Sequence, residues 1–103
     1  MTRHVHVEPE ASAELEDAAL WYERQRAGLG ADLTLAVDEA LTLLEQWPRL
    51  GHPIPQLRAD IPARLVPVQR FPYTVVYMEW HNAIRVLAIA HERRAPGYWL
   101  TRV

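Results

Sequence analysis

YTVVYMEW-HN-AIRVLAIAH, residues 73–91, is the stretch of the sequence that decides the fold. Both of its halves are rich in β-branched and aromatic side chains, which favour strands. His81 and Asn82, between the halves, predict a tight hairpin turn. From Ala83 to Ala90 the second half is apolar except for Arg85, as in a central strand that is covered on both faces. The stretch therefore predicts a β-hairpin at the middle of a sheet.

Two further strands are expected outside this hairpin. Residues 64–68 precede it and combine apolar side chains with Pro67, which cannot donate to a ladder and predicts an edge or a bulge there. Residues 3–7 alternate polar and apolar side chains, which is typical of a short strand. His4 and His6 lie on the same side of this strand, but no Cys, Asp or third His accompanies them locally, so no metal site is expected.

Two helices are expected between the first strand and the others. The first begins at Pro9, and its apolar residues recur at steps of three and four until Gly28-Leu29-Gly30 interrupts the pattern. The second has a clean apolar stripe between Leu33 and Leu44 and ends at Trp47-Pro48. The short break predicts an antiparallel helical hairpin.

Together these elements predict an α+β fold with the order β-α-α-β-β-β, in which the helical hairpin packs on a small, mainly antiparallel sheet. A loop with four prolines, residues 48–62, joins the helices to the later strands. With 103 residues, the chain is expected to form a single domain, residues 1–103.

Composition and charge restrict the classes of function. The chain has no cysteine, no recognisable leader and no apolar stretch long enough for a membrane, so a cytoplasmic protein without a membrane partner is expected. The net charge of −2 conceals an uneven distribution. Residues 1–60 carry five arginines and eleven carboxylates, whereas residues 61–103 carry six arginines and two carboxylates. The two halves are therefore expected to have different roles.

The common catalytic motifs are missing from the sequence. It contains no P-loop, GxGxxG, GxSxG or HExxH motif, and a chain of this length seldom provides both a core and a deep pocket. We therefore expect no cofactor and no small-molecule substrate, but a surface that acts on a macromolecule.

The segment from His91 to Arg102 is the densest polar and aromatic cluster of the chain, and it has two interpretations. In the functional one, its arginines contact phosphate or carboxylate groups, Tyr98 or Trp99 stacks on a base, and His91 moves a proton. In the structural one, Tyr98 and Trp99 fold back onto the sheet and the arginines pair with carboxylates of the helices.

The first helix also has two features that need an interpretation. Its acidic residues Glu14, Glu16 and Asp17 are expected to form a solvated face that matches the helix dipole. Its apolar run Leu20-Trp21-Tyr22 widens the apolar stripe, through either a groove for a partner or additional contact with the core.

Several of these segments resemble the RelE/ParE toxin superfamily. RFPYTVVY (residues 70–77) and IRVLAIAHERRAPGYW (residues 84–99) are similar to the C-terminal half of its members. Ala13-Glu14-Leu15, Trp21-Tyr22-Glu23 and Gly28-Leu29-Gly30 resemble its first helix and turn, so the resemblance covers nearly the whole chain. It implies the toxin of a type II toxin–antitoxin pair, neutralised by an antitoxin whose flexible segment wraps around it.

The superfamily has two kinds of target, and departures from its pattern favour one. RelE-like members cleave mRNA on the ribosome, whereas ParE-like members poison DNA gyrase. Lysine is absent here, and Glu92 stands where the ribonuclease branch places an arginine, although Arg93 is next to it. The resemblance therefore favours gyrase as the target. A ribosome-dependent mRNA endoribonuclease and a non-toxic module that only binds its antitoxin remain alternatives.

The resemblance also implies roles for individual residues. If the chain is a ribonuclease, His91 is the base or acid, Arg93 or Arg64 holds the phosphate, and Tyr98 stacks or transfers a proton. The residues expected to contact the target or a phosphate are Arg64, Arg70, Arg94 and Arg102. The antitoxin, which is expected to contribute an amphipathic and partly acidic segment, would contact Trp21, Arg93, Arg94 and Trp99.

Overall fold

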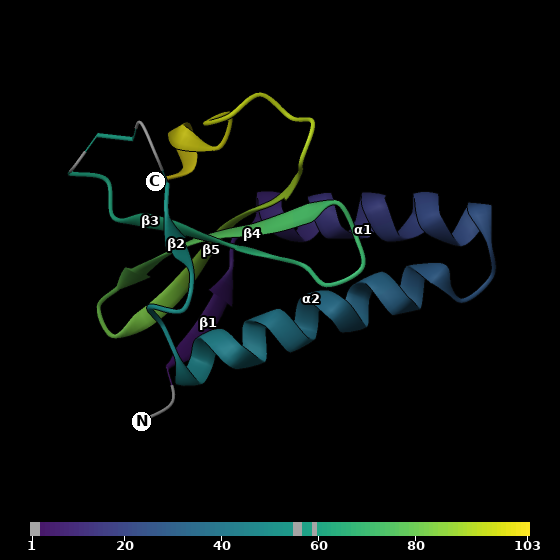
Figure 1. Cartoon of the computed structure of the whole chain (residues 1–103), viewed down its shortest axis with the longest axis horizontal. Coiled ribbons are helices and arrows are strands. Elements are labelled where there is room, and N and C mark those ends of the chain that lie inside the picture. Colours follow the sequence, from purple (N-terminus) through teal and green to yellow (C-terminus); the bar gives the residue numbers. More distant parts are fainter. Residues whose placement is uncertain (1–2, 55–56, 59) are drawn as a thin grey trace.

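The computed structural model describes residues 3–54, 57–58 and 60–103 and contains two helices beside one sheet (Figure 1). β4 (Tyr73–Trp80) and β5 (Ala83–His91) have the expected bounds, β1 (His4–Val7) begins one residue later than expected, and β3 (Ala63–Pro67) is displaced by one residue. The break between the helices comprises residues 26–28 rather than the expected Gly28-Leu29-Gly30, because the second helix already begins at Leu29, directly after Gly28, whose φ of 92° is left-handed. The elements in chain order are β1 (His4–Val7), α1 (Pro9–Gln25), α2 (Leu29–Gln46), β2 (His52–Pro53), β3 (Ala63–Pro67), β4 (Tyr73–Trp80), β5 (Ala83–His91) and the 3₁₀-helix η1 (Leu100–Arg102).

The sheet has five strands in the order β1-β5-β4-β3-β2. β1 runs parallel to β5, and the other neighbours are antiparallel, which confirms the mainly antiparallel sheet and the position of β5 between two strands. The sequence did not predict β2, which lies inside the proline-rich loop and pairs with Arg64 and Leu65 of β3. A strand of two residues is too short to show a periodic pattern.

The turn between β4 and β5 has the predicted geometry. His81 and Asn82 both have positive φ, 48° and 63°, as a two-residue hairpin of the type I′ kind requires. Because β2 begins at His52, opposite Leu65, Pro67 lies on a part of β3 without a described outer neighbour. The prediction of an edge at Pro67 is therefore confirmed.

A β-bulge lies in β5, where Val76 pairs with Ala88 but Tyr77 pairs with Val86. Leu87 is the extra residue, and it reverses the alternation of side chains along the strand. Val86 and Ile89 consequently both face the helices, although they are three residues apart.

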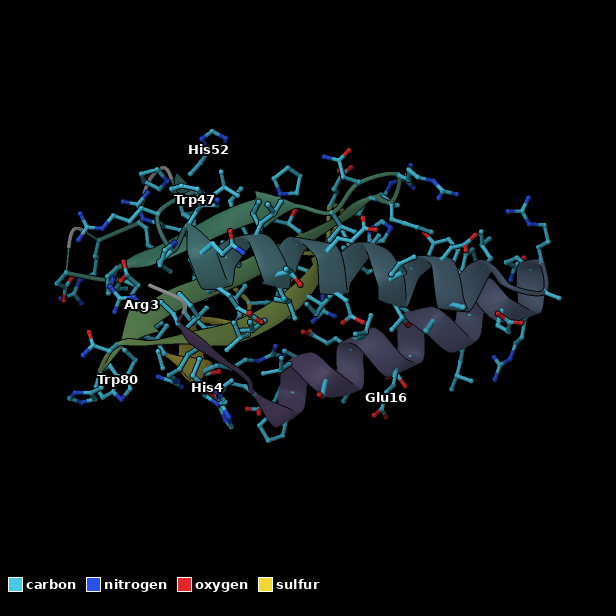
Figure 2. All side chains as sticks on the ribbon, turned by 90° about the horizontal axis from the view of Figure 1, so that it is seen from below. Arg3, His4, Glu16, Trp47, His52 and Trp80 are labelled. Carbon is cyan, nitrogen blue, oxygen red and sulfur yellow. The ribbon has the colours of Figure 1, made fainter. Side chains whose placement is uncertain are left out.

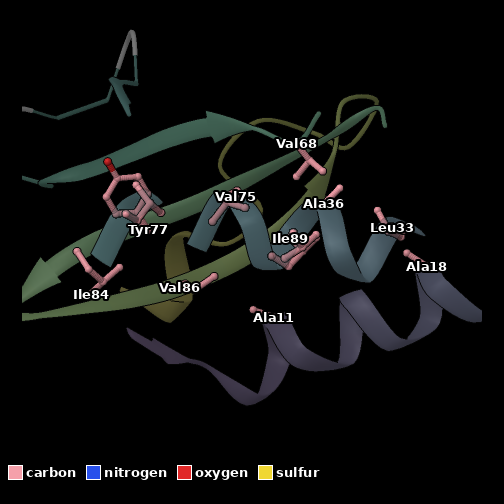
Figure 3. Packing of buried hydrophobic residues seen from close by; sticks show 13 residues of the cluster. Ala11, Ala18, Leu33, Ala36, Val68, Val75, Tyr77, Ile84, Val86 and Ile89 are labelled. Atoms are coloured by element: carbon pink, nitrogen blue, oxygen red, sulfur yellow. The ribbon is translucent and has the colours of Figure 1, made fainter. Parts of the chain in front are cut away.

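Both helices cover the same face of the sheet, and Figure 3 shows the core between the helices and the sheet. Leu33, Val75 and Tyr77 are fully buried in this core. The helices approach each other closely at Gly30, because a Cβ atom there would lie 2.4 Å from the carbonyl oxygen of Ala19. The opposite face of the sheet carries a smaller cluster that includes Trp99 of the C-terminal tail. No helix within the described part of the chain is long and apolar enough to cross a membrane.

Candidate functional site

A surface cavity of about 270 Å³ lies where α1, the end of β5 and the C-terminal tail meet. It brings together residues of α1, the start of β4, and the end of β5 with the adjoining tail, among them four of the predicted site residues. We call it the tail site, and its lining residues are Glu14, Asp17, Ala18, Trp21, Tyr73, Ile89, His91, Arg94 and Tyr98.

The end of β1 explains why this site forms. β1 pairs with β5 only as far as Val86, so the following residues of β5 have no strand on that side in the described part of the chain. Side chains satisfy the backbone groups there: Glu14 accepts the N–H of Ile89 at 3.1 Å, and Arg102 donates to the carbonyl oxygen of Leu87 at 3.0 Å. The bulge residue Leu87 thus lies beside the residues that join the tail to α1.

Glu14 is the centre of this junction. Its carboxylate accepts the hydroxyl hydrogen of Tyr98 at 2.6 Å and pairs with the Arg102 guanidinium, with the shortest contact at 2.9 Å. The Glu14 and Arg102 side chains are only 17% and 16% exposed, so water screens the pair less than it screens a surface ion pair. The junction therefore holds the tail against the helix.

The position of Glu14 corrects an expectation from the sequence. The interpretation of Glu14 as part of a solvated acidic face is wrong, whereas Glu16 is exposed and points away from the sheet (Figure 2). The helical pattern shows charge that matches the dipole, but it does not show that a tail 84 residues later returns to this carboxylate. Glu14 is the structural residue that sequence reasoning missed.

The surroundings of Tyr98 and Arg102 stabilise their ordinary protonation states. Burial, followed by the hydrogen bond to Glu14 and the charge of that carboxylate, raises the pKa of Tyr98 to about 12. The hydrogen bond to Glu14 is also the main reason why the pKa of Arg102 is raised. At neutral pH this is a fixed set of one phenol, one carboxylate and one guanidinium.

Different residues of the tail fit the structural and the functional interpretation. The structural interpretation is confirmed for Tyr98, Arg102 and Trp99, which is only 4% exposed and packs in the second core cluster. Arg93 and Arg94 are exposed, and neither forms an ion pair with another described residue. The Arg94 guanidinium lies over the Tyr98 ring, 3.9 Å from its centroid. Only the first half of the tail therefore presents free cations.

His91 lies at the base of the tail site beside an aromatic ring. Its imidazole meets the Tyr73 ring edge-on, with the ring centroids 5.0 Å apart. Its Nδ1 accepts the backbone N–H of Arg93 at 3.0 Å, so this nitrogen takes part in the turn after β5.

The four arginines predicted to contact a target or phosphate do not meet in one place. Arg94 lines the tail site and Arg102 is paired with Glu14. Arg64 donates to the carbonyl oxygen of Gly51 at 2.9 Å, and Arg70, in the turn after β3, lies 3.9 Å from an Asp32 carboxylate oxygen. A contact by each of them would therefore involve different surfaces.

The apolar run on α1 contributes both to the core and to the exposed surface. Tyr22 packs edge-on against Phe71, with the ring centroids 5.2 Å apart, and is attached to the core. Leu20 and Trp21 remain 57% and 54% exposed. Trp21 thus places an exposed aromatic ring at the rim of the tail site.

Comparisons with known proteins agree with this fold and organisation. Residues 5–96 match the model of a family described as the ParE toxin of type II toxin–antitoxin system, parDE. No curated protein matches the chain. Among solved structures, a chain described as "Chromosomal ParDE TA system from P. aeruginosa" is similar, with a TM-score of 0.74 and 16% identity over 87% of this chain and 96% of that chain. That likeness shows the fold, and the family match, which spans nearly the whole sequence, confirms the resemblance: the chain belongs to the ParE family of type II toxin–antitoxin toxins.

Proposed function

We propose that this toxin inhibits bacterial growth by poisoning DNA gyrase and that a cognate antitoxin neutralises it. Membership of the ParE family supports the toxin, and the similarity to a chain of a ParDE system supports an antitoxin as its partner. The choice of gyrase over ribosome-bound mRNA depends on the state of the candidate catalytic groups.

One observation carries this choice: the Tyr98 hydroxyl is held by Glu14 at 2.6 Å, and its pKa is raised to about 12. Efficient proton transfer requires a pKa near the working pH, so this phenol is a poor general acid or base near pH 7. The Arg94 and Arg102 guanidiniums also lie over the Tyr98 ring, at 3.9 Å and 5.2 Å from its centroid, and leave less of it for stacking on a base.

The remaining members of the ribonuclease set are no better placed. His91 uses Nδ1 to accept the Arg93 backbone N–H, while Arg93 itself is exposed. Cleavage by the 2′-hydroxyl needs a base, a phosphate clamp and an acid that converge on one phosphodiester. A gyrase poison needs only a surface that complements its target, and that requirement suits this chain better.

The antitoxin is proposed to cover the tail site. Trp21 presents apolar surface there, and Arg94, with its exposed neighbour Arg93, supplies positive charge. An amphipathic segment with carboxylates on its polar side would bury the tryptophan and pair with the two arginines. Trp99 is 4% exposed, so its expected contact with the antitoxin would require the tail to move.

Expression of the chain alone in bacteria, followed by assays on the purified protein, tests this proposal. We expect growth arrest, relief of the arrest by the co-expressed antitoxin, inhibited supercoiling by purified gyrase, and intact transcripts in primer extension. Ribosome-dependent cleavage that His91→Ala or Tyr98→Phe abolishes would replace gyrase with mRNA as the target. Antitoxin binding without any arrest of growth would leave only the non-toxic module.

A further inference from the structure

A second and larger cavity, of about 510 Å³, opens where α2 ends, beside the start of β1 and the end of β4. It shares no lining residue with the tail site. Figure 2 shows Arg3 and Trp47 together at the end of the molecule opposite to the turn between the helices. We call this surface the Trp47 patch, and its lining residues are Arg3, Gln46, Trp47, Pro48, Arg49, Leu50 and Glu79.

The patch exposes large apolar side chains that the core does not use. Trp47 is 61% exposed and Leu50 is 46% exposed, although both follow the helix that supplies much of the core. Exposed tryptophan together with arginine is the composition that dominates binding energy in protein–protein interfaces. The patch therefore has the composition of an interaction surface.

The backbone that carries these side chains is fixed by a buried tyrosine. The Tyr77 hydroxyl donates to the carbonyl oxygen of Pro48 at 2.8 Å and accepts the N–H of Gly51 at 2.9 Å. A Cβ atom at Gly51 would lie 2.6 Å from that hydroxyl, so the loop and the ring fit closely. Because the loop is already ordered, a partner that binds Trp47 and Leu50 does not have to offset the entropy lost when a flexible loop is fixed.

The charges of the patch are incompletely balanced. Arg3 and Arg49 share the single carboxylate of Glu79, at 3.7 Å and 3.5 Å. The Arg49 side chain is 82% exposed, and Arg3 is also anchored by donating to the Asn82 side chain at 2.8 Å. One carboxylate between two guanidiniums leaves one positive charge in excess, which a carboxylate from a partner would complement.

We propose that the Trp47 patch docks an acidic segment of the toxin's protein target, with an apolar side chain against Trp47 and Leu50 and a carboxylate between Arg3 and Arg49. This inference rests on the proposed function and assigns the target to the end of the molecule opposite to the antitoxin. A protein segment fits better than a nucleic-acid strand, because the phosphates that follow one another along a strand would also meet the Glu79 carboxylate.

Two substitutions separate target binding from antitoxin binding. Trp47→Ala removes the apolar contact, and Arg49→Glu reverses the excess charge without touching the core. In a supercoiling assay and in direct binding to DNA-free gyrase, we expect each variant to lose activity by roughly tenfold or more. Their affinity for the antitoxin should stay within about twofold of the wild type, because distant sites act independently.

Matched controls come from the same chain. Arg58→Glu reverses another highly exposed arginine, which is 80% exposed and is not among the residues that line the patch, and should leave gyrase inhibition unchanged. Trp21→Ala removes the exposed tryptophan of the tail site and should weaken the antitoxin complex but not inhibition. Thermal unfolding of all four variants identifies any that lost inhibition by failing to fold.

The inference and the proposed function fail in distinguishable ways. Full gyrase inhibition by both folded patch variants, an equal loss of antitoxin affinity, or gyrase binding that requires DNA would each overturn the docking site. If the wild type arrests growth but does not inhibit gyrase, the proposed target is wrong, and growth arrest becomes the measurement for the same variants. Retained arrest by Trp47→Ala and Arg49→Glu would then overturn the docking site as well. Loss of arrest by both variants would instead mean that the Trp47 patch docks a protein target other than gyrase. A wild type that does not arrest growth overturns both.

Discussion

The two halves of the C-terminal tail both contain arginine, but their side chains have opposite environments. In residues 98–102, Tyr98, Trp99 and Arg102 are attached to α1 and to the sheet. In residues 91–97, Arg93 and Arg94 are exposed, and neither pairs with a carboxylate among the described residues. Residue type alone therefore does not determine the role of an arginine. Arg102 is structural because Glu14 and the bulged part of β5 lie within its reach.

The buried half should have the largest effect on stability. Trp99→Ala removes a side chain that is 4% exposed in the second core cluster, so we expect the free energy of unfolding to fall by about 3–5 kcal/mol. Urea unfolding followed by circular dichroism measures this loss. Trp21→Ala is the control, because that tryptophan is 54% exposed and should cost less than about 1 kcal/mol. Equal losses would show that the tail is not packed as described.

Removing the centre of the junction should have the next largest effect. Glu14→Ala leaves the half-buried Arg102 guanidinium without its carboxylate and the Ile89 N–H without its acceptor, at a cost of about 3 kcal/mol. Glu16→Ala on the exposed side of α1 should change stability by less than about 0.5 kcal/mol. The two curves should be measured in urea under the same conditions. Coincident midpoints would contradict the assignment of Glu14 to the junction.

The phenol of Tyr98 should make stability depend on pH only under alkaline conditions. Its pKa is about 12 in the folded protein against an ordinary value of 10, so its contribution is fully present below pH 10 and is lost as the pH rises toward 12. Tyr98→Phe should reduce this alkaline loss in unfolding curves measured from pH 9 to pH 12. Part of the loss should remain, because burial also raises the pKa of Tyr73 and Tyr77. An unchanged pH profile would contradict the contact with Glu14.

The exposed half should have the smallest effect on stability and a selective effect on binding. The double change Arg93→Glu and Arg94→Glu removes the contact of Arg94 with the Tyr98 ring, so we expect a loss of about 0.5–1 kcal/mol. Affinity for the antitoxin should fall by roughly tenfold or more, and less at high salt.

A second pair of exposed arginines provides the control for that measurement. Arg24→Glu with Arg26→Glu introduces the same change of charge at the end of α1. Calorimetric titration of both double variants with the antitoxin separates a specific contact from a general effect of net charge. Equal weakening by the two would argue against the first half of the tail as part of the interface.

Local sequence patterns predicted most of the fold but little of the candidate site. The bounds of β4 and β5, the turn at His81-Asn82 and the first helix follow from patterns among neighbouring residues, and the structure confirms them. The exposed Trp21 and the exposed cations Arg93 and Arg94 were also identified from composition. The contacts of Glu14 with Tyr98 and Arg102 were not identified, because the acidic run has the same sequence pattern whether its carboxylates are solvated or bound to the tail.

The sequence by itself determined the order of the helices and of every strand except β2, the faces of the helices and the uneven distribution of charge, because each depends on residues that are close in the chain. Only the tertiary structure decided that β1 runs beside β5 and stops at Val86, that Leu87 forms a bulge, and that Glu14, Tyr98 and Arg102 meet at the strand edge left open. It also decided that Arg3, Arg49 and Trp47 share one surface with Glu79. These are contacts between segments distant in sequence, and their geometry depends on how the whole chain packs its core.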